Sequence, residues 1–146
     1  MLLDPDRVFS LANGAAALAW VALVFSPGSA RWAPTVWRVT GRWLPAALAV
    51  LYVAMLATHW RGQGGFGSVV QVRALFDVPG ALVAGWVHYL AFDLFVGSWI
   101  AERAAVMKLH HALLVPVLLL TFMFGPAGLL AFVLLRPQQS LSGNPT

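Results

Sequence analysis

The sequence of 146 residues contains no cysteine and little charge. Without a thiol the chain cannot form a disulfide, a cysteine nucleophile, or a cysteine-ligated zinc or iron–sulfur site. Charged residues make up 10% of the chain, whereas soluble domains average about 25%. Because 60% of the residues are hydrophobic, a soluble core of this size could not bury them. These shortages exclude an ordinary water-soluble globule and favour an integral membrane protein.

Acidic residues are also scarce, with five Asp and Glu against nine Lys and Arg. The basic residues that produce the net charge of +4 are scattered along the chain rather than clustered. A nucleic-acid-binding protein would need a dense basic face. We therefore expect no nucleic-acid partner, and we assign most of the basic residues to the loops that flank membrane helices.

Four apolar stretches are each close to the length of about 20 residues that a bilayer crossing requires. We therefore predict an all-α, polytopic membrane protein with a single four-helix domain over residues 1–136 and a polar tail over residues 137–146. The predicted transmembrane helices span residues 5–25, 43–60, 78–101 and 111–135.

Local signals support this division of the chain. Asp4 before Pro5 is a favourable helix start. Ser68 is placed to cap a short amphipathic helix on the membrane surface, within which Arg73 either anchors to headgroups or reaches a buried acid. Pro116 and the Gly125-Pro126 pair predict bends in the last transmembrane helix. The segment 26–42, rich in Trp and Arg, is predicted to lie at the membrane interface.

The orientation of the chain in the membrane stays open at this point. Four spans would place both chain ends on one side of the membrane. Basic residues then number four on that side (Arg7, Arg61, Arg73 and Arg136) and five on the other (Arg31, Arg38, Arg42, Arg103 and Lys108). A difference of one does not decide the orientation under the positive-inside rule.

The third apolar stretch carries most of the chemistry. Its central part, GWVHYLAFDLFVGSWIAE from Gly85 to Glu102, contains several ionisable groups, which are costly at membrane depth and usually functional there. A helical wheel separates two faces at about 100° per residue. We expect the aliphatic face (Val83, Val87, Leu90, Ala91 and Leu94) to contact lipid. We expect the other face (Ala81, Gly85, His88, Tyr89, Phe92, Asp93, Phe95, Trp99 and Glu102) to point into the bundle.

His88, Tyr89 and Asp93 are the candidate catalytic residues of this helix. Tyr89 and Asp93 are spaced for a hydrogen bond at i and i+4. His88 and Asp93 are separated by about 140°, so they are expected to flank a cavity rather than to pair. Burial favours the neutral forms of both groups, and a neutral acid beside a neutral imidazole can give and take a proton. The alternative is that both groups only hold helices together.

Histidine also ligates metals and tetrapyrroles. The available residues are His59, His88, His110 and His111, with His111 and Glu102 expected at the rim of the site. Adjacent His110 and His111 diverge by about 100° on a helix, and no HExxH spacing occurs. We predict no metal site, while a haem- or chlorophyll-binding subunit remains an alternative.

Two stretches resemble the abscisic-acid-deficient-4-like membrane proteins, which in plants are required to make neoxanthin from violaxanthin. They are GWVHYLAFDLFVGSWI at residues 85–100 and HALLVPVLLLTFMFGPAGLL at residues 111–130. The loop from Gly65 to Phe76, with Arg73, is also similar. Ser98 differs, because a basic residue is expected there in the family.

The resemblance implies a membrane protein that acts on or near carotenoids, in a bacterial inner membrane or a plastid-like membrane. An epoxide would be isomerised to an allene without a redox cofactor, with Asp93 as the acid, His88 as the base and Tyr89 orienting Asp93. Gly85, Trp86, Phe92, Trp99 and Arg73 would contact the ligand. The expected partners are membrane lipid, a carotenoid or another isoprenoid, and a second copy of the chain or a pigment complex. The alternative is a non-catalytic carotenoid-binding or assembly subunit of such a complex.

Overall fold

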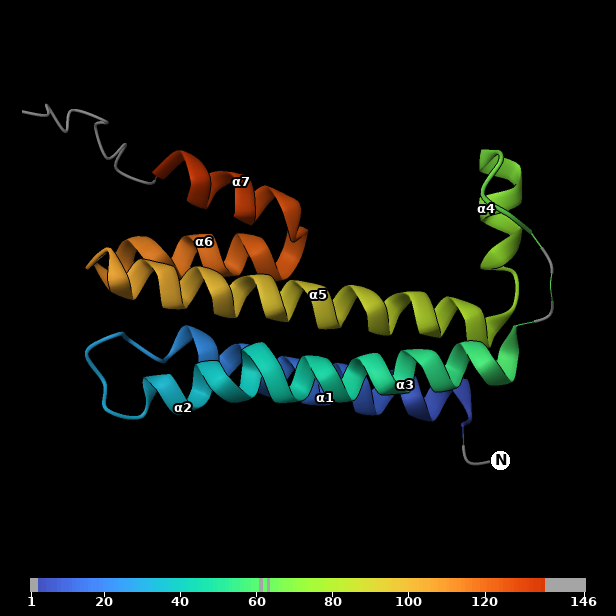
Figure 1. Cartoon of the computed structure of the whole chain (residues 1–146), viewed down its shortest axis with the longest axis horizontal. Helices are drawn as coiled ribbons and strands as arrows, with labels where there is room; N and C mark the ends of the chain where they lie inside the picture. The colour runs from blue at the N-terminus through green and yellow to red at the C-terminus, as the bar shows by residue number, and fades with distance from the viewer. Residues whose placement is uncertain (1–2, 61, 63, 136–146) are drawn as a thin grey trace, which may run out of the picture.

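The computed structural model describes residues 3–60, 62 and 64–135, and this part of the chain is helical without any strand. Three long apolar helical segments lie side by side along most of the molecule (Figure 1). The first is α1 (Pro5–Val24), and the third is α5 (Pro79–Val106). The second runs from Ala33 to His59 as α2 (Ala33–Arg38), η1 (Val39–Trp43) and α3 (Leu44–His59). These helices confirm the predicted all-helical, polytopic membrane class.

The second helical segment begins ten residues earlier than residue 43, where the sequence predicted its start. Much of the connector expected at the interface is therefore helix. Within it, η1 is a π-helix, a wider turn that often marks functional sites. Gly41 in this turn faces α5 so closely that a Cβ at position 41 would lie 2.9 Å from the Ser98 Cβ. The buried Ser98 hydroxyl donates to Thr40 Oγ1 at 2.7 Å, which fixes η1 to α5.

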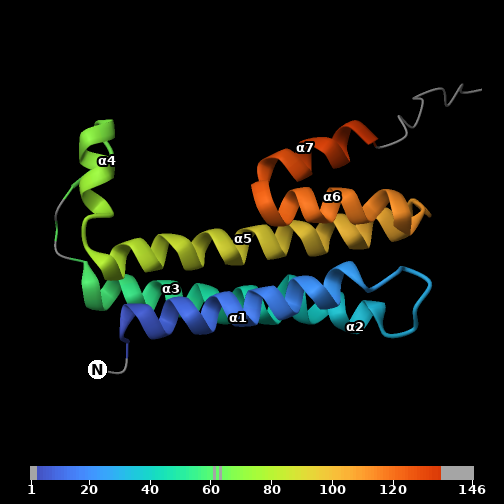
Figure 2. The same cartoon turned by 180° about the vertical axis from the view of Figure 1, so that it is seen from behind.

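The stretch predicted as one bent helix over residues 111–135 is two helices. α6 (His111–Phe124) and α7 (Pro126–Leu135) are joined at Gly125, and α7 turns back over α6 (Figures 1 and 2). At 1.5 Å per residue they measure about 21 and 15 Å, which is less than the roughly 30 Å of a hydrocarbon core. Gly125 has a φ of 23°, and Pro126 cannot continue the α6 hydrogen-bond ladder. The predicted bend is therefore a reversal, and we name this pair the α6–α7 hairpin.

The two predicted faces of α5 are largely exchanged, although Ala81 and Asp93 are buried as predicted. The residues assigned to lipid are buried, with Val87 and Leu94 fully enclosed. His88 is exposed, and Phe92 is 59% exposed. The reason is that α5 is the central helix, packed against α1, α3 and α6. Between membrane helices close packing rather than hydrophobicity decides which face is buried, so compact aliphatic side chains point inward and large rings point outward.

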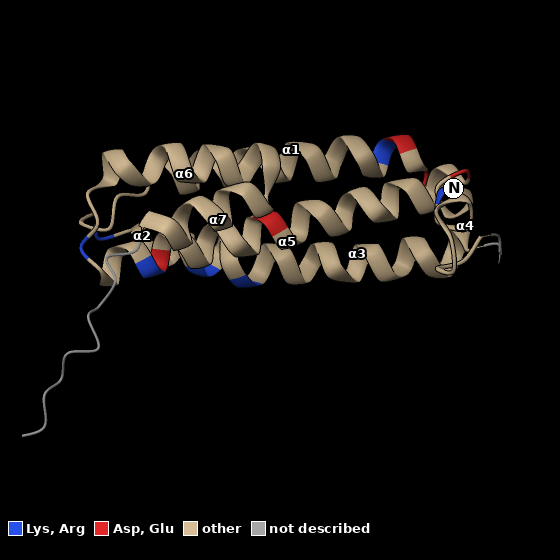
Figure 3. Cartoon of the chain, turned by 90° about the horizontal axis from the view of Figure 1, so that it is seen from above, with Lys and Arg blue, Asp and Glu red and all other residues tan. Residues whose placement is uncertain are grey.

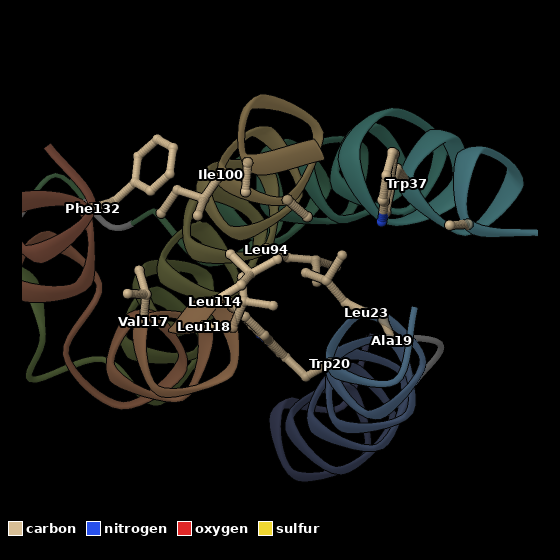
Figure 4. Close-up of a cluster of buried hydrophobic side chains, with 13 residues drawn as sticks. Ala19, Trp20, Leu23, Trp37, Leu94, Ile100, Leu114, Val117, Leu118 and Phe132 are labelled. Atoms are coloured by element: carbon tan, nitrogen blue, oxygen red, sulfur yellow. The ribbon is translucent and has the colours of Figure 1, made fainter. Parts of the chain in front are cut away.

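Two buried clusters hold the bundle together. The cluster in Figure 4 joins α1, α2, α5 and the α6–α7 hairpin, with Trp20 and Leu23 of α1 directed toward Leu94 and Leu118. Gly97 makes this packing possible, since a Cβ there would collide with the Trp20 ring. The second cluster joins α1, α3 and α5 through residues such as Ala12, Met55 and Val87. α5 belongs to both clusters, and its position is therefore fixed along its whole length.

Most of the Lys, Arg, Asp and Glu residues lie toward the two ends of the bundle (Figure 3), whereas Asp93 lies near the middle of α5. α4 (Val69–Leu75) crosses one end at a steep angle to the long helices (Figure 1). Its predicted cap is confirmed, because Ser68 Oγ accepts from the Gln71 N–H at 3.2 Å. The chain enters α1 at this end, whereas α7 runs back toward the other end. The predicted tail over residues 137–146 lies outside the described residues.

Candidate functional site

Asp93 occupies the centre of the longest helix. α5 runs from Pro79 to Val106, and the Asp93 side chain is only 8% exposed. Asp93 is the one Asp or Glu residue among the buried side chains of the described chain. A carboxyl group in this position is expensive in lipid and is a functional candidate for that reason.

The turn of the α6–α7 hairpin closes over this carboxyl group. A Cβ at position 125 would collide with the Asp93 carboxyl, so only glycine allows the turn to approach so near. One helical turn earlier on α5, the Tyr89 hydroxyl donates to the backbone carbonyl of Met123 at 3.3 Å. Tyr89 is also the polar neighbour of Asp93 on α5. Tyr89 and Asp93 of α5 therefore both contact the turn that joins α6 to α7.

One oxygen of Asp93 has no partner. Oδ2 is buried and receives no hydrogen bond from any described residue. Buried polar atoms are nearly always hydrogen-bonded, and leaving one unpaired costs about 1–3 kcal/mol. Asp93 therefore holds an unused hydrogen-bonding position, enclosed beneath the hairpin turn.

His88 does not share this position. Its ring stacks on Phe92 at a centroid distance of 4.6 Å and lies 5.4 Å from Tyr52 of α3. It is exposed on the α3 side of α5, as the rotation of about 140° between His88 and Asp93 requires. The predicted inward direction of His88 and Phe92 is therefore wrong, and the structure does not bring His88 and Asp93 to one cavity.

Trp86 lies next to Tyr89 on the same side of the bundle. Its ring is 5.5 Å from Tyr89 and 5.9 Å from Phe9, and its Nε1 donates to Asn13 Oδ1 at 2.9 Å. Gly85 serves another purpose, because a Cβ there would lie 2.7 Å from the Phe76 ring. Trp86 thus provides an aromatic surface leading toward Tyr89, whereas Gly85 lets the loop after α4 pack on α5.

The remaining predicted ligand and rim residues lie elsewhere. Trp99 contacts Phe132 of α7 edge-on at 5.8 Å, and the Arg103 guanidinium lies 5.9 Å from the Trp99 ring centroid. Arg73 is on α4, which lies at one end of the bundle (Figure 1). Glu102 lines a small cleft. It forms no ion pair with Arg103 or Lys108, since the ion pair found among the described residues joins Arg7 and Asp4.

The histidines are dispersed. His111 Nε2 contacts the Val24 carbonyl at 2.9 Å, while its buried Nδ1 has no partner among the described residues. His110 caps α6 by accepting from the Ala112 N–H, and His59 packs against Gly80. Within residues 3–60, 62 and 64–135, no three His, Asp or Glu side chains come together in a group able to hold a metal ion.

Two apolar clefts open on the sides of the bundle. One, of about 560 Å³, lies between α1 and α6, with His111 at one end and with Trp20, Phe25 and Phe122 in its walls. The other, of about 480 Å³, lies between α3 and α5 and is bounded by Arg42 and Phe95. Both volumes are in the range of small-molecule sites, about 300–1,000 Å³.

The hairpin turn is the part of the site that the sequence did not predict. The sequence predicts only a bend of the helix at Gly125. It gives no indication that the backbone carbonyl of Met123 accepts a hydrogen bond from Tyr89. A glycine followed by proline is nevertheless typical of a helix end. A helix end between two apolar stretches that are each too short to cross the membrane could have indicated that the chain reverses there.

The ABA DEFICIENT 4-like family model matches residues 7–132. The match covers the three long helices and most of the α6–α7 hairpin, and therefore includes Tyr89, Asp93 and Gly125. It confirms the resemblance found from the sequence. No curated protein and no solved structure matched the chain.

Proposed function

Because this chain belongs to the ABA DEFICIENT 4-like family, we propose that it isomerises an epoxy-carotenoid or a related isoprenoid in the membrane by acid–base catalysis at Asp93. The observation that carries the proposal is the unpaired, buried Oδ2 of Asp93 at the centre of α5. A structural carboxyl group would be expected to have both oxygens satisfied. An acid that must meet an epoxide needs one position free.

The chemistry requires one proton donor and one proton acceptor. Neutral Asp93 donates its proton to the epoxide oxygen, the carbon–oxygen bond breaks, and the positive charge spreads into the polyene. The Asp93 carboxylate then takes a proton from the adjacent chain carbon, and the C–H electron pair forms the second double bond of an allene. The proton count is unchanged, so the reaction is a net isomerisation without a redox step.

This scheme modifies the role expected for His88. Since His88 lies on the α3 side of α5, it would have to reach the substrate from a different face than Asp93. A single carboxyl group that first gives and then takes the proton needs no such movement, and general acid–base catalysis by one positioned side chain contributes about 10²–10⁴-fold to a rate.

Access to Asp93 would depend on the α6–α7 hairpin. Two contacts with α5 stabilise the turn of this hairpin. They are the hydrogen bond from Tyr89 to the Met123 carbonyl and the close approach of Gly125 to Asp93. A small outward movement of the turn would uncover the carboxyl group beside the rings of Tyr89 and Trp86, which lie 5.5 Å apart. Aromatic rings in this position suit a conjugated chain.

The cleft between α1 and α6 favours a second candidate function, which is carotenoid binding without catalysis. Its lining is apolar and includes three aromatic residues, Trp20, Phe25 and Phe122. A polyene bound there would lie on the surface of the bundle, away from any proton transfer. This function would suit an assembly subunit of a pigment complex.

The two functions are separated by purifying the protein and reconstituting it in vesicles that contain violaxanthin. Product formation above that of protein-free vesicles, followed by chromatography, supports the isomerase. Retention of a carotenoid absorption band without product supports the binding protein, whereas a Soret band would indicate a tetrapyrrole and contradict both.

A further inference from the structure

A second cleft lies on another face of α5, between this helix and the segment formed by η1 and α3. It consists of two adjoining parts, of about 480 and 150 Å³, which share Gly41, Arg42 and Phe95. The larger part is further lined by Pro45, Ala46, Ala49, Ala91 and Phe92. The smaller part is further lined by Ser98, Trp99 and Glu102.

The larger part has the shape of a slot for one hydrocarbon chain. Small residues on α3, Ala46 and Ala49, face the rings of Phe92 and Phe95 on α5. From Arg42 to Ala49 the slot follows the helix for about 10 Å at 1.5 Å per residue. The exposed faces of Phe92 and Phe95, 59% and 49% exposed, are available to a chain lying between the helices.

The mouth of the cleft carries two charged side chains of opposite sign, Arg42 and Glu102. Neither belongs to an ion pair within the part of the chain that the structure describes. The neighbouring Arg103 guanidinium faces the Trp99 ring. Arg31, Arg38 and Lys108 belong to α2 and to the loops at the same end of the bundle. The local charge is therefore positive, and the Glu102 carboxylate is the acidic group of the cleft.

We propose that this cleft binds one anionic phospholipid with a hydroxylated headgroup, of the phosphatidylglycerol type. An acyl chain fills the slot between Ala46 and Phe92, the phosphate binds the Arg42 guanidinium, and the headgroup hydroxyls donate to the Glu102 carboxylate. This site is independent of Asp93, which lies on a different face of α5.

The chemistry of the mouth selects this headgroup. Arginine recognises phosphate through a charged, planar set of N–H donors. A carboxylate beside that phosphate is unfavourable unless the ligand brings hydrogen-bond donors to the carboxylate, and the hydroxyl groups of a glycerol headgroup are such donors. A choline headgroup has no hydrogen-bond donor for the Glu102 carboxylate, and its quaternary ammonium would lie close to Arg42, so phosphatidylcholine fits less well.

Native mass spectrometry of the purified protein in detergent tests the proposal, with equal concentrations of phosphatidylglycerol and phosphatidylcholine. We expect the wild-type protein to retain mainly phosphatidylglycerol with one lipid per chain. Arg42→Gln should lower this retention about fivefold, since one basic residue near a membrane surface contributes about 1 kcal/mol to anionic lipid binding.

Arg38→Gln is the matched control for charge, because Arg38 is exposed at the same end but does not line the cleft. Ala46→Phe should fill the slot and lower the binding of both lipids, while Ala47→Phe, on the exposed side of α3, should not. Equal losses in Arg42→Gln and Arg38→Gln, or equal retention of the two lipids by the wild type, would overturn the proposal. If Arg42→Gln does not fold, the comparison of Ala46→Phe with Ala47→Phe decides whether the slot holds a lipid.

Discussion

Gly125, at the reversal between α6 and α7, lies so close to Asp93 that any side chain at position 125 would collide with the Asp93 carboxyl group. The turn and the acid come from segments 32 residues apart in the sequence (125 − 93). Their contact places a hairpin of two helices, each too short to cross the membrane, against the buried acid at the centre of α5. This relationship connects the fold to the proposed chemistry.

Gly125→Ala is expected to destabilise the protein. The substitution adds a Cβ against the Asp93 carboxyl and forces alanine into a positive φ, and we expect a cost of about 1–3 kcal/mol. The unfolding temperature in detergent should fall by about 5 °C or more. Gly14→Ala is the control, because a Cβ there meets nothing within 4 Å. Equal unfolding temperatures for the two variants would contradict the contact.

Tyr89→Phe is expected to loosen the hairpin turn while leaving the bundle intact. It removes the hydrogen bond to the Met123 carbonyl, which contributes about 0.5–1.5 kcal/mol. Hydrogen exchange at residues 121–129 should become faster, because local opening costs less. Tyr52→Phe is the matched change, since Tyr52 packs on His88 away from the turn. Exchange that is unchanged in Tyr89→Phe would show that the bond does not hold the turn.

The hairpin changes the expected topology, because three crossings place the start of α1 and the end of α7 on opposite sides. Among the described residues, five basic residues (Arg31, Arg38, Arg42, Arg103 and Lys108) then belong to the half of the bundle that contains α2, against two (Arg7 and Arg73) at the end with α4. The positive-inside rule now predicts that the end with α2 faces the cytoplasm or its equivalent.

Single introduced cysteines test this topology without background, since the chain has no cysteine of its own. A membrane-impermeant maleimide should label Val70→Cys in intact cells, and should label Ser29→Cys and Leu135→Cys only after lysis. Labelling of Leu135→Cys together with Val70→Cys would mean that residues 111–135 cross the membrane, and the hairpin would then be wrong.

Ser98→Lys introduces the basic residue expected in the family and should destabilise this chain. The Ser98 side chain is buried against Gly41 and donates to Thr40, so a lysine would bring an unpaired charge into this contact. We expect little folded protein in size-exclusion chromatography. Ser29→Lys, at an exposed position, is the control, and a well-folded Ser98→Lys would show that η1 can move away from α5.

Local chemistry predicted the parts of the fold that depend on neighbouring residues. Asp4 accepts from the Arg7 N–H at 3.3 Å, and Ser68 caps α4, as the sequence indicated. The apolar lengths of α1 and α5 also sufficed to identify them as membrane helices. These features require only a few consecutive residues, and tertiary packing did not override them.

Features that depend on packing could not be predicted in the same way. A helical wheel of α5 separates aliphatic from aromatic residues, but it does not say which face meets protein, and the buried Val87 and exposed Phe92 show that close packing decided. The burial of Asp93 was predicted correctly, because a carboxyl group at membrane depth is costly when it faces lipid and is therefore expected to face protein. The Tyr89 bond to Met123 involves a backbone carbonyl, and sequence reasoning cannot assign such a partner.

The central claim is that Asp93 both gives and takes the proton, and the most direct measurement is the turnover of violaxanthin by reconstituted Asp93→Asn and His88→Ala proteins. We predict that Asp93→Asn, which cannot donate an acidic proton, loses at least about 100-fold in rate while remaining folded. His88→Ala, altered on the other face of α5, should stay within a few-fold of the wild type. Full activity in Asp93→Asn, or loss of activity in His88→Ala alone, would contradict the mechanism.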